Sequence, residues 1–401
     1  MNIELVRKID FWAGIPACWL LTVAGFLLKP FARKPLSSPK KFLFIELSEM
    51  GSAILAYPTM KALKKQYPSA ELFFLIFEKN RASVDILKTI PEENVLVIRE
   101  RSPVSFLSDV LRVIFRMRKE NIDCVFDLEL FTRVTAILGF LSGAPIRVGF
   151  HKFRMEGLYR GNLHTHKIQY NYQQHISKSF LSFVQVLRHP QKDWPAMEES
   201  IQDQEIEIAD YQTTESGISN LWNKLREFYP EISQGHKLII FNPSAGEIPI
   251  RAWPVEKYIE LGKRILSDPQ NVIILMGAGA DWETTQKVHQ ALAHERCIQF
   301  TGQTTFPELM DLFSISDLLI TNDSGPAHFA SLTPIRNFIF FGPETPRLYA
   351  PLGKNTQILY SNFPCSPCLT AYNHRNTPCK DNKCLQAISV DEVYDLIKVH
   401  L

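Results

Sequence analysis

Three loops of small residues in the second half of the chain have the composition of phosphate-binding loops. They are Pro243–Gly246, Gly277–Ala280 and Asn322–Pro326, and each directly follows a short apolar run. Small residues allow backbone N–H groups to approach a phosphate closely, although a single such loop also serves as an ordinary turn. Three of them at one edge of a sheet predict a pocket for a nucleotide diphosphate. The candidate binding residues in the first two loops are Ser244, Gly246 and Gly277.

The third loop also predicts the start of a helix. Pro326 suits the first turn of a helix, and the small and acidic residues before it are good N-caps. The positive end of that helix would lie at the carboxyl end of a strand, where open α/β sheets bind phosphorylated ligands. An ordinary strand–turn–helix connection carries the same residue types. The candidates from this loop and its helix are Asp323, Ser324, Gly325 and His328.

Arg251 is a candidate for a fixed positive charge beside these loops. It lies just before Trp253 and Pro254, which predict the start of another helix. A guanidinium can bind two phosphate oxygens at once. A surface arginine near a helix start is the alternative interpretation.

Four of the seven cysteines lie within twenty residues near the C-terminus. Two residues separate the first pair and four separate the last pair, a spacing typical of a structural zinc site with four thiolate ligands. Paired disulfides and an iron–sulfur cluster are the alternatives. The candidate metal ligands are Cys365, Cys368, Cys379 and Cys384.

The elements that must position these residues alternate along both halves of the chain. Apolar runs such as Lys41–Leu47 and Lys237–Asn242 predict strands, and runs with helical periodicity, such as Ser52–Tyr67, follow them. Strands separated by helices predict parallel sheets with helices on both faces, and 401 residues exceed a usual single core. We therefore expect two Rossmann-like domains. The expected segments are an N-terminal apolar segment with a basic linker (1–40), a first domain (41–190), a linker (191–236), a second, phosphate-binding domain with the cysteine cluster (237–388) and a C-terminal helix (389–401).

The composition is that of a globular protein, with 45% hydrophobic and 21% charged residues. The formal net charge is only +2, so nothing in the charge balance indicates a nucleic acid as partner.

An uncharged stretch of eighteen residues, Phe11–Leu28, lies near the N-terminus between basic residues. Its length is at the lower limit for spanning a bilayer, Pro16 interrupts it, and Trp12 and Trp19 suit the membrane interface. We expect a membrane-associated segment that lies in or dips into one leaflet rather than crossing. A buried helix packed on the first domain is the alternative. A cleaved signal peptide is disfavoured, because no small-x-small cleavage site precedes the first strand.

The segment 151–175 holds basic side chains among Tyr and Asn residues without a regular period. It could receive an anionic acceptor, or it could be a solvated loop. The basic residues are Arg154, Arg160, His164, His166, Lys167 and His175.

Taken together, the second half resembles the donor-binding domain of glycosyltransferase family 9, the ADP-heptose:lipopolysaccharide heptosyltransferases. The residues that carry the resemblance are NPSAG…RAWPVEKYIELGKRI, ILMGAGAD and TGQTTFPELMDLFSISDLLITNDSGPAHFASLTPIRNFIFFGPETP. The resemblance covers nearly the whole chain after the N-terminal segment and is most specific in these C-terminal motifs; the first half matches more by layout.

The resemblance implies a GT-B fold, in which two Rossmann-like domains face a cleft. It also implies an inverting transfer, with no metal or other cofactor in catalysis, of a sugar such as heptose. The donor would be a nucleotide-diphosphate sugar, possibly ADP-heptose, held by the second domain, and the acceptor a lipopolysaccharide or other surface glycan held by the first. The protein would work in the cytoplasm, at the cytoplasmic face of the inner membrane.

Carried over by motif, the resemblance places Asp323, Ser324, Gly325 and His328 in the family's donor site, and Arg251 where the family has a basic residue near the donor phosphates. Together with the helix N-terminus, Arg251 would stabilise the charge of the leaving diphosphate. Asp323 would orient sugar or ribose hydroxyls.

The first domain departs from the family pattern at the catalytic base. The family usually has Gly-Asp after the first strand, whereas this chain has Gly51-Ser52. A serine cannot accept a proton unaided. Glu49 is the first candidate for a substitute base and Glu129, at the end of another strand, is the second. The alternative is a catalytically silent nucleotide-sugar-binding or scaffold protein of the same fold.

Overall fold

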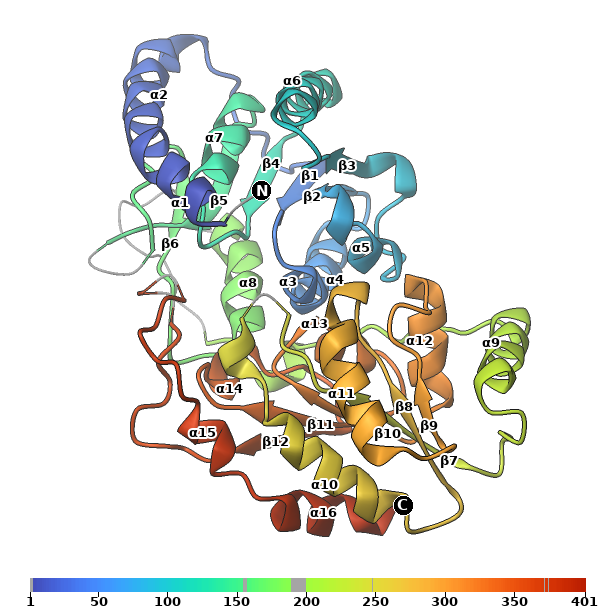
Figure 1. Cartoon of the computed structure of the whole chain (residues 1–401). Coiled ribbons are helices and arrows are strands. Elements are labelled where there is room, and N and C mark those ends of the chain that lie inside the picture. The colour runs from blue at the N-terminus through green and yellow to red at the C-terminus, as the bar shows by residue number, and fades with distance from the viewer. Residues whose placement is uncertain (1–2, 154–156, 189–199, 247, 371, 374) are drawn as a thin grey trace. The chain divides into compact units, whose positions relative to one another are not determined.

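We obtained a computed structural model of the chain, which describes residues 3–153, 157–188, 200–246, 248–370, 372–373 and 375–401 (Figure 1). The chain forms two compact units, Met1–Glu207 and Ile208–Leu401. Each unit contains one six-stranded sheet in which every paired neighbour is parallel. The predicted α/β architecture with two parallel sheets is confirmed.

The sheet of the first unit has the strand order β3-β2-β1-β4-β5-β6. The chain therefore builds outward from β1 in one direction and then starts again at β4 on the other side of β1. Apolar residues fill the strands almost completely, as burial on both faces of a parallel sheet requires. The strands are β1 (Lys41–Ile45), β2 (Glu71–Phe77), β3 (Val95–Ile98), β4 (Cys124–Asp127), β5 (Ile146–Phe150) and β6 (His166–Ile168).

Helices cover both faces of this sheet. Alternate residues of β1, such as Leu43, pack with Val113 and Leu138 of α6 and α7, whereas Phe44 and Phe126 face α8 through Phe183. The period of two in strand side chains explains the division between the faces. The helices of the first unit are α1 (Ile3–Trp12), α2 (Gly14–Leu28), α3 (Met50–Leu55), α4 (Tyr57–Gln66), α5 (Ala82–Asp85), α6 (Pro103–Glu120), α7 (Val134–Leu141) and α8 (Ile176–Gln185).

The uncharged N-terminal stretch forms helices that dock on α7. Cys18 of α2 is buried against Ala136. Asp10 of α1 is bound at the start of α7, where its Oδ1 accepts from the Arg133 backbone N at 2.7 Å and its Oδ2 accepts from Arg133 Nη1 at 2.6 Å. The N-terminal helices are therefore fastened to the first unit by a largely buried ion pair.

Most of the apolar side chains of α2 nevertheless remain uncovered. Trp19 is 57% exposed and Phe26 is 77% exposed. Within the described residues, Lys8–Phe31 is the one helical stretch long and apolar enough to cross a membrane by length and composition. Buried core helices can pass the same test, but they do not leave their apolar side chains exposed in this way.

The sheet of the second unit repeats the same plan, with the order β12-β11-β10-β7-β8-β9. Here β7 is the first strand, and β10 restarts the sheet on its other side. The strands are β7 (Lys237–Asn242), β8 (Asn271–Leu275), β9 (Cys297–Gln299), β10 (Leu318–Asn322), β11 (Arg336–Phe341) and β12 (Thr356–Tyr360).

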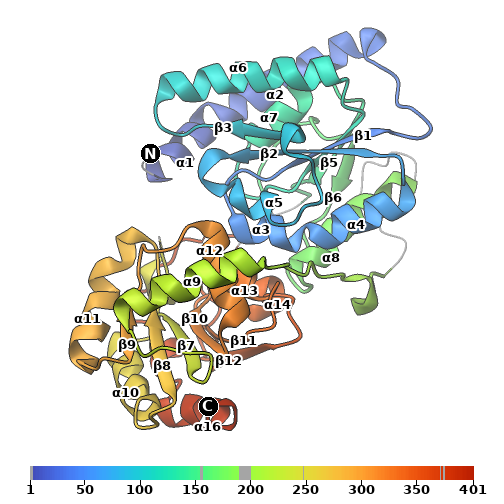
Figure 2. The same cartoon turned by 90° about the vertical axis from the view of Figure 1, so that its right-hand side faces the viewer.

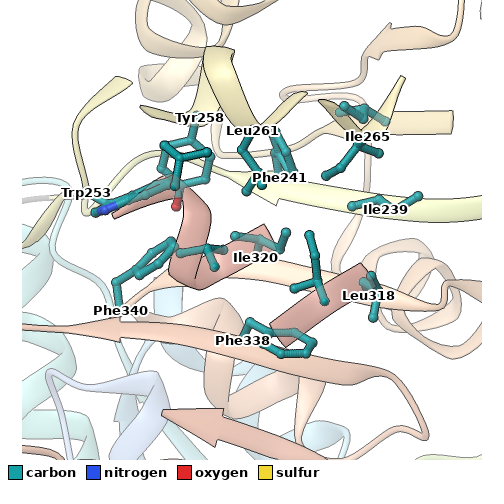
Figure 3. Close-up of a cluster of buried hydrophobic side chains, with 14 of the residues drawn as sticks. Ile239, Phe241, Trp253, Tyr258, Leu261, Ile265, Leu318, Ile320, Phe338 and Phe340 are labelled. Carbon is teal, nitrogen blue, oxygen red and sulfur yellow. The ribbon is translucent and has the colours of Figure 1, made fainter. Parts of the chain in front are cut away.

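The core of the second unit lies between this sheet and α10, α11 and α16. Trp253, fully buried, stacks on Phe340 with ring centroids 4.4 Å apart, and Tyr258 meets Trp253 edge-on (Figure 3). Val393 and Ile397 of α16 belong to the same cluster, so the C-terminal helix packs within the second unit. The helices are α9 (Glu215–Phe228), α10 (Val255–Ile265), α11 (Trp282–Leu292), α12 (Phe306–Ile315), α13 (Gly325–Ala330), α14 (Pro346–Tyr349), α15 (Lys383–Gln386) and α16 (Val390–Ile397).

Two local expectations differ from the structure. The helix expected over Ser52–Tyr67 is two helices, α3 and α4, with Ala56 between them and Pro58 in the first turn of α4. Proline cannot donate the backbone hydrogen bond that a continuous helix would need there. Within the stretch expected as a linker, 191–199 lies outside the described residues and Glu215–Phe228 forms α9 of the second unit.

Candidate active site

Two of the three candidate donor loops lie at the carboxyl ends of β7 and β10. These are the neighbouring strands at which the order of the second sheet reverses. Open α/β sheets bind ligands at such a switch point, because the chain leaves the two strands in opposite directions and opens a crevice. Two buried asparagines hold the loops together. Asn322 Nδ2 donates to the Ser244 carbonyl at 3.0 Å, and Asn242 Nδ2 donates to Thr321 Oγ1 at 3.0 Å.

The loop after β8 is joined to the loop after β7 through Asp281. Ser244 Oγ donates to Asp281 Oδ1, and Asp281 Oδ2 accepts from the Ala278 backbone N at 2.8 Å. A Cβ at position 277 would lie 2.8 Å from the Asp281 Cβ, so Gly277 is required for the approach of Asp281. Gly246 has φ +56°, a conformation that favours glycine. Ser244, Gly246 and Gly277 thus shape the backbone of the predicted pocket.

Arg251 lies between two buried carboxylates. Its Nη2 is 2.8 Å from Glu344 Oε2, and its Nη1 is 3.5 Å from Asp323 Oδ2. Glu344, which is 2% exposed and follows β11, also pairs with Arg375 at 3.3 Å. The backbone N–H of Trp253 donates to Asn322 Oδ1 at 2.8 Å, which fixes the segment that carries Arg251. The predicted arginine therefore lies beside the predicted aspartate, with its charge shared among buried groups.

The loop after β10 leads into α13, the helix whose start Pro326 predicts. Ser324 is the N-cap, and Pro326 stands in the first turn. The Gly325 position leaves open space around an added Cβ apart from ordinary contact with Phe329. His328 lies in the last turn of α13 and is buried, at 7% exposed. Ser324 and Gly325 therefore present the first N–H groups of a helix at the switch point, where an anion would be favoured.

Three carboxylates meet at the corresponding switch point of the first unit, at the ends of β1 and β4. Glu46 follows β1, Glu49 is the N-cap of α3, and Glu129 follows β4 by two residues. Ser52 Oγ donates to Glu49 Oε2 at 3.0 Å, and Ser48 Oγ donates to Glu129 Oε2 at 2.9 Å. The structure brings together Glu49, Ser52 and Glu129, all proposed from the sequence, and adds Glu46.

The pKa values of two carboxylates of this cluster are raised. Burial raises the pKa of Glu46 well above its ordinary value, and the charges of Glu129 and Glu49 raise it further. Burial and the Glu49 charge also raise the pKa of Glu129, although hydrogen bonds from Ser48 and Glu46 oppose the rise. Glu46 and Glu129 are 3% and 2% exposed, whereas Glu49 is half-buried. Glu49 is therefore the carboxylate of this group that a ligand can reach.

Two side chains of the basic segment, Arg160 and His164, bind to the strand and loop that carry Glu129. Arg160 is 1% exposed and donates through Nη2 to the carbonyls of Glu129 at 2.5 Å and Thr132 at 2.8 Å. His164 Nε2 lies 2.9 Å from Asp127 Oδ2, and burial lowers the pKa of this histidine. Neither side chain is available to an acceptor or to bulk solvent, so the expectation of a ligand-binding or solvated loop is wrong for both. Arg154 lies outside the described residues.

The four clustered cysteines are free thiols. Burial raises the pKa of Cys384 to about 11, and Cys368 and Cys365 are close enough to contribute to that rise. Cys379 Sγ instead donates to the Asp381 carbonyl at 3.2 Å. Across the part of the chain that the structure describes, no group of three or more His, Cys, Asp or Glu side chains is arranged to hold a metal ion.

Sequence reasoning missed Glu46, Asp281 and Glu344, and it considered Arg375 only as a possible contact for an anionic acceptor. Glu46 closes an apolar run and has the position of a last strand residue. Glu344 and Arg375 meet Arg251 only because distant loops converge at the strand ends. The signal that could have found the two glutamates is their place, directly after a buried strand for Glu46 and three residues after one for Glu344, where carboxylates are costly unless partnered.

Comparison with known proteins gives a consistent result. The model of the family described as glycosyltransferase family 9 (heptosyltransferase) matches residues 110–377. Lipooligosaccharide heptosyltransferase 2 of Campylobacter jejuni is 25% identical over 171 residues, 42% of this chain and 52% of that protein. The chain thus matches about half the length of that relative.

Two further relatives extend over more of the chain. Lipopolysaccharide heptosyltransferase 3 of Escherichia coli is 23% identical over 311 residues, 76% of this chain and 83% of that protein. The solved structure of E. coli ADP-heptose lipopolysaccharide heptosyltransferase II has a TM-score of 0.69 at 18% identity and covers 90% of this chain and 98% of its own. That likeness confirms the predicted GT-B type of fold.

Proposed function

This chain belongs to glycosyltransferase family 9, and on that premise we propose that it transfers a sugar from a nucleotide-diphosphate donor to a hydroxyl of a surface-glycan acceptor. The observation that carries the proposal is the pair of switch points. The switch point of the second unit has small residues, a helix N-terminus and Arg251, which can bind a diphosphate. The switch point of the first unit has carboxylates, which can accept the proton of a hydroxyl.

The donor would bind at the ends of β7 and β10. First-turn N–H groups at Ser324 and Gly325 and the guanidinium of Arg251 would stabilise the negative charge that forms on the diphosphate as its bond to the sugar breaks. Fixed protein charges of this kind serve the leaving group without a metal ion. Asp323, which already contacts Arg251, would accept hydrogen bonds from sugar or ribose hydroxyls.

The acceptor would be activated by Glu49. Its carboxylate would take the proton of the acceptor hydroxyl as the oxygen attacks the anomeric carbon and the nucleotide diphosphate departs from the opposite side, so the anomeric configuration inverts. The Ser52 hydroxyl orients Glu49 through its 3.0 Å hydrogen bond. Glu129, the second candidate, is buried and occupied by Ser48, which favours Glu49 as the base.

For the donor sugar and the acceptor we propose ADP-heptose and lipopolysaccharide core. The support comes from the relatives, since the E. coli protein with the same fold is described as an ADP-heptose lipopolysaccharide heptosyltransferase. A site at the cytoplasmic face of the inner membrane follows from such an acceptor and from the exposed apolar face of α2. No nucleic acid is invoked.

We also propose a structural zinc ion at Cys365, Cys368, Cys379 and Cys384, separate from catalysis. The spacing in the sequence supports it; the four thiols are not arranged as a metal site in this structure, and Cys379 would have to give up its hydrogen bond to Asp381. Elemental analysis of the purified protein should find one zinc per chain, and this zinc should be lost in Cys365→Ser/Cys368→Ser. The absence of stoichiometric metal from the unsubstituted protein would remove this proposal.

The transferase function is tested by donor binding followed by turnover. ADP-heptose should raise the melting temperature in a concentration-dependent way, because a ligand that binds only the folded state stabilises it. UDP- and GDP-sugars should do so more weakly. Mass spectrometry of a heptose-deficient lipopolysaccharide acceptor should then show one added heptose. Binding of ADP-heptose without transfer to any acceptor would instead support a silent nucleotide-sugar-binding protein.

A further inference from the structure

Helix α6 carries an apolar stripe on the face that points away from the sheet. The stripe comprises Val104, Leu107, Leu111 and Phe115, which are 79%, 59%, 60% and 72% exposed. Their spacing of three, four and four residues places them on one side of the helix, one above the other. A surface helix of a globular protein normally presents polar side chains there.

This exposed stripe is separate from the face of α6 that packs against the sheet. Val113 and Met117 are 2% and 0% exposed and pack in the core beside the sheet, with Phe106, Val110 and Ile114 partly buried around them. α6 is therefore apolar on an outer side as well as on its inner side. The inner side accounts for folding, and the outer side needs another explanation.

Basic side chains flank the outer stripe. Arg112, Arg118 and Lys119 are exposed beside it, whereas the acidic residues of the helix lie elsewhere. Asp109 is buried and paired with Arg99 and Arg112, and Glu120 pairs with Lys41. An apolar stripe with a cationic border matches a surface of acyl chains and anionic headgroups.

The stripe lies on the same side of the first unit as the exposed N-terminal helix. α6 and α7 cover one face of the sheet, and α2 packs on the outside of α7. In both views α2 and α6 lie along the same end of this unit (Figures 1 and 2). The two helices with exposed apolar side chains therefore lie at one end of the first unit.

We propose that α6 is a second membrane contact, which lies in the interface of an anionic bilayer with Val104, Leu107, Leu111 and Phe115 in contact with the acyl chains. α2 supplies the first contact, and the two helices together fix the orientation of the first unit on the membrane. The proposal extends the membrane-facing role given above, but it does not depend on the transfer reaction.

Oxidative footprinting of the full-length protein tests the contact residue by residue. Phe115, Leu107 and Leu111 should become several-fold less reactive when vesicles of phosphatidylethanolamine and phosphatidylglycerol are added. The exposed residues Phe228 and Trp282 of the second unit serve as internal controls and should not change. Protection of Phe26 with unchanged reactivity of Phe115 would overturn the proposal, because α2 alone would then contact the bilayer.

A charge substitution tests the energetic contribution. Leu111→Glu/Phe115→Glu should lower the fraction that sediments with these vesicles, with a loss of tenfold or more in the partition coefficient. Leu396→Glu/Val399→Glu, a matched pair in the second unit, should bind as the unsubstituted protein does. Circular dichroism and the ADP-heptose melting shift, measured on each variant, separate failure of this proposal from failure to fold or to bind donor.

Two other outcomes would contradict a membrane role for α6. Equal binding of Leu111→Glu/Phe115→Glu and the unsubstituted protein to these vesicles would show that the stripe contributes nothing. Protection of Phe115 that depends on protein concentration, and not on vesicles, would assign the stripe to contact between copies of the chain.

Discussion

The hydroxyl of Ser52 donates a 3.0 Å hydrogen bond to the carboxylate of Glu49, one helical turn earlier in the chain. In the resemblance to the family, position 52 is where an aspartate would serve as base. Here the serine at that position binds a carboxylate supplied by its own loop. In the proposed mechanism the acid–base function would thus be displaced by three residues rather than deleted, which gives the first two predictions.

Glu49→Gln should reduce the turnover number by about 10²- to 10⁴-fold, the usual contribution of a positioned general base. The amide keeps the shape and can still accept from Ser52, so the ADP-heptose melting shift should persist. Glu93→Gln, an exposed carboxylate of the same unit, is the control and should leave turnover unchanged. Unchanged turnover of Glu49→Gln would eliminate Glu49 as the base.

Glu49→Gln/Ser52→Asp should recover part of the lost transfer activity. It restores a carboxylate at the position where the family has its aspartate and removes the one that Ser52 now orients. Single-turnover rates with saturating donor would measure the recovery. If the double variant is as inactive as Glu49→Gln, the equivalence of the two positions is wrong.

Glu46→Gln should stabilise the protein at alkaline pH. The pKa of Glu46 is raised from its ordinary value of 4.5, so the folded state binds its proton more tightly than the unfolded chain does. That contribution to stability is present below the unfolded pKa and is lost as pH rises through the folded pKa. Glutamine imitates the protonated form, so the melting temperature should rise by roughly 2–4 °C at pH 8 for each kcal/mol regained.

The control for this prediction is acid solution. At pH 4, below the ordinary pKa of 4.5, Glu46 is mostly protonated in both states, and the variant should melt within about a degree of the unsubstituted protein. A variant less stable at pH 8 but not at pH 4 would mean that Glu46 is needed as a charged group.

Arg251→Ala should destabilise the second unit by about 3–5 kcal/mol, because it leaves the buried carboxylates of Asp323 and Glu344 with less compensation. Arg251→Ala/Glu344→Gln should recover part of that loss, since one of the two carboxylates becomes neutral. Urea unfolding measures both. Neither variant should give a melting shift with ADP-heptose, which separates the role in donor binding from the role in folding.

Asn322→Asp should weaken donor binding by more than its effect on the free energy of unfolding would explain. The carboxylate can still accept from the Trp253 N–H, but it cannot donate to the Ser244 carbonyl, so two oxygens would oppose each other where a 3.0 Å hydrogen bond now joins the loops. Thr301→Val, at another buried hydrogen-bonding side chain of the same unit, is a control of comparable disruption. Equal donor affinity in the two variants would show that the loop junction is irrelevant to the site.

Local sequence signals were sufficient for the strands that form continuous apolar runs and for the loops that follow them, but β6 and β12 were not predicted. Lys237–Asn242 was predicted with its observed bounds, because a buried parallel strand is a continuous apolar run ended by small residues. The helix after Asn322–Pro326 was also predicted, since proline and small caps specify a helix start through adjacent residues alone.

What the sequence could not provide are relationships between distant segments. The Glu46–Glu129 contact depends on β4 pairing beside β1, and the Arg251–Glu344 pair depends on β11 following β10 in the sheet. The outer stripe of α6 was also missed, because an apolar residue on a helix gives no indication of which face meets the core until the packing is known.

The Asp10–Arg133 pair joins the N-terminal helices to the chain just after Glu129, and Arg160 donates to a backbone carbonyl of that same stretch. Under the proposed membrane contact, the depth of the N-terminal helices in the lipid would set the height of the carboxylate cluster above the bilayer. An acceptor anchored in the same leaflet would be selected by the length of glycan between its lipid and its reacting hydroxyl. Only a hydroxyl at the height of the carboxylate cluster could reach Glu49. The protein would then transfer sugar only to glycolipids whose glycan has already reached a certain length.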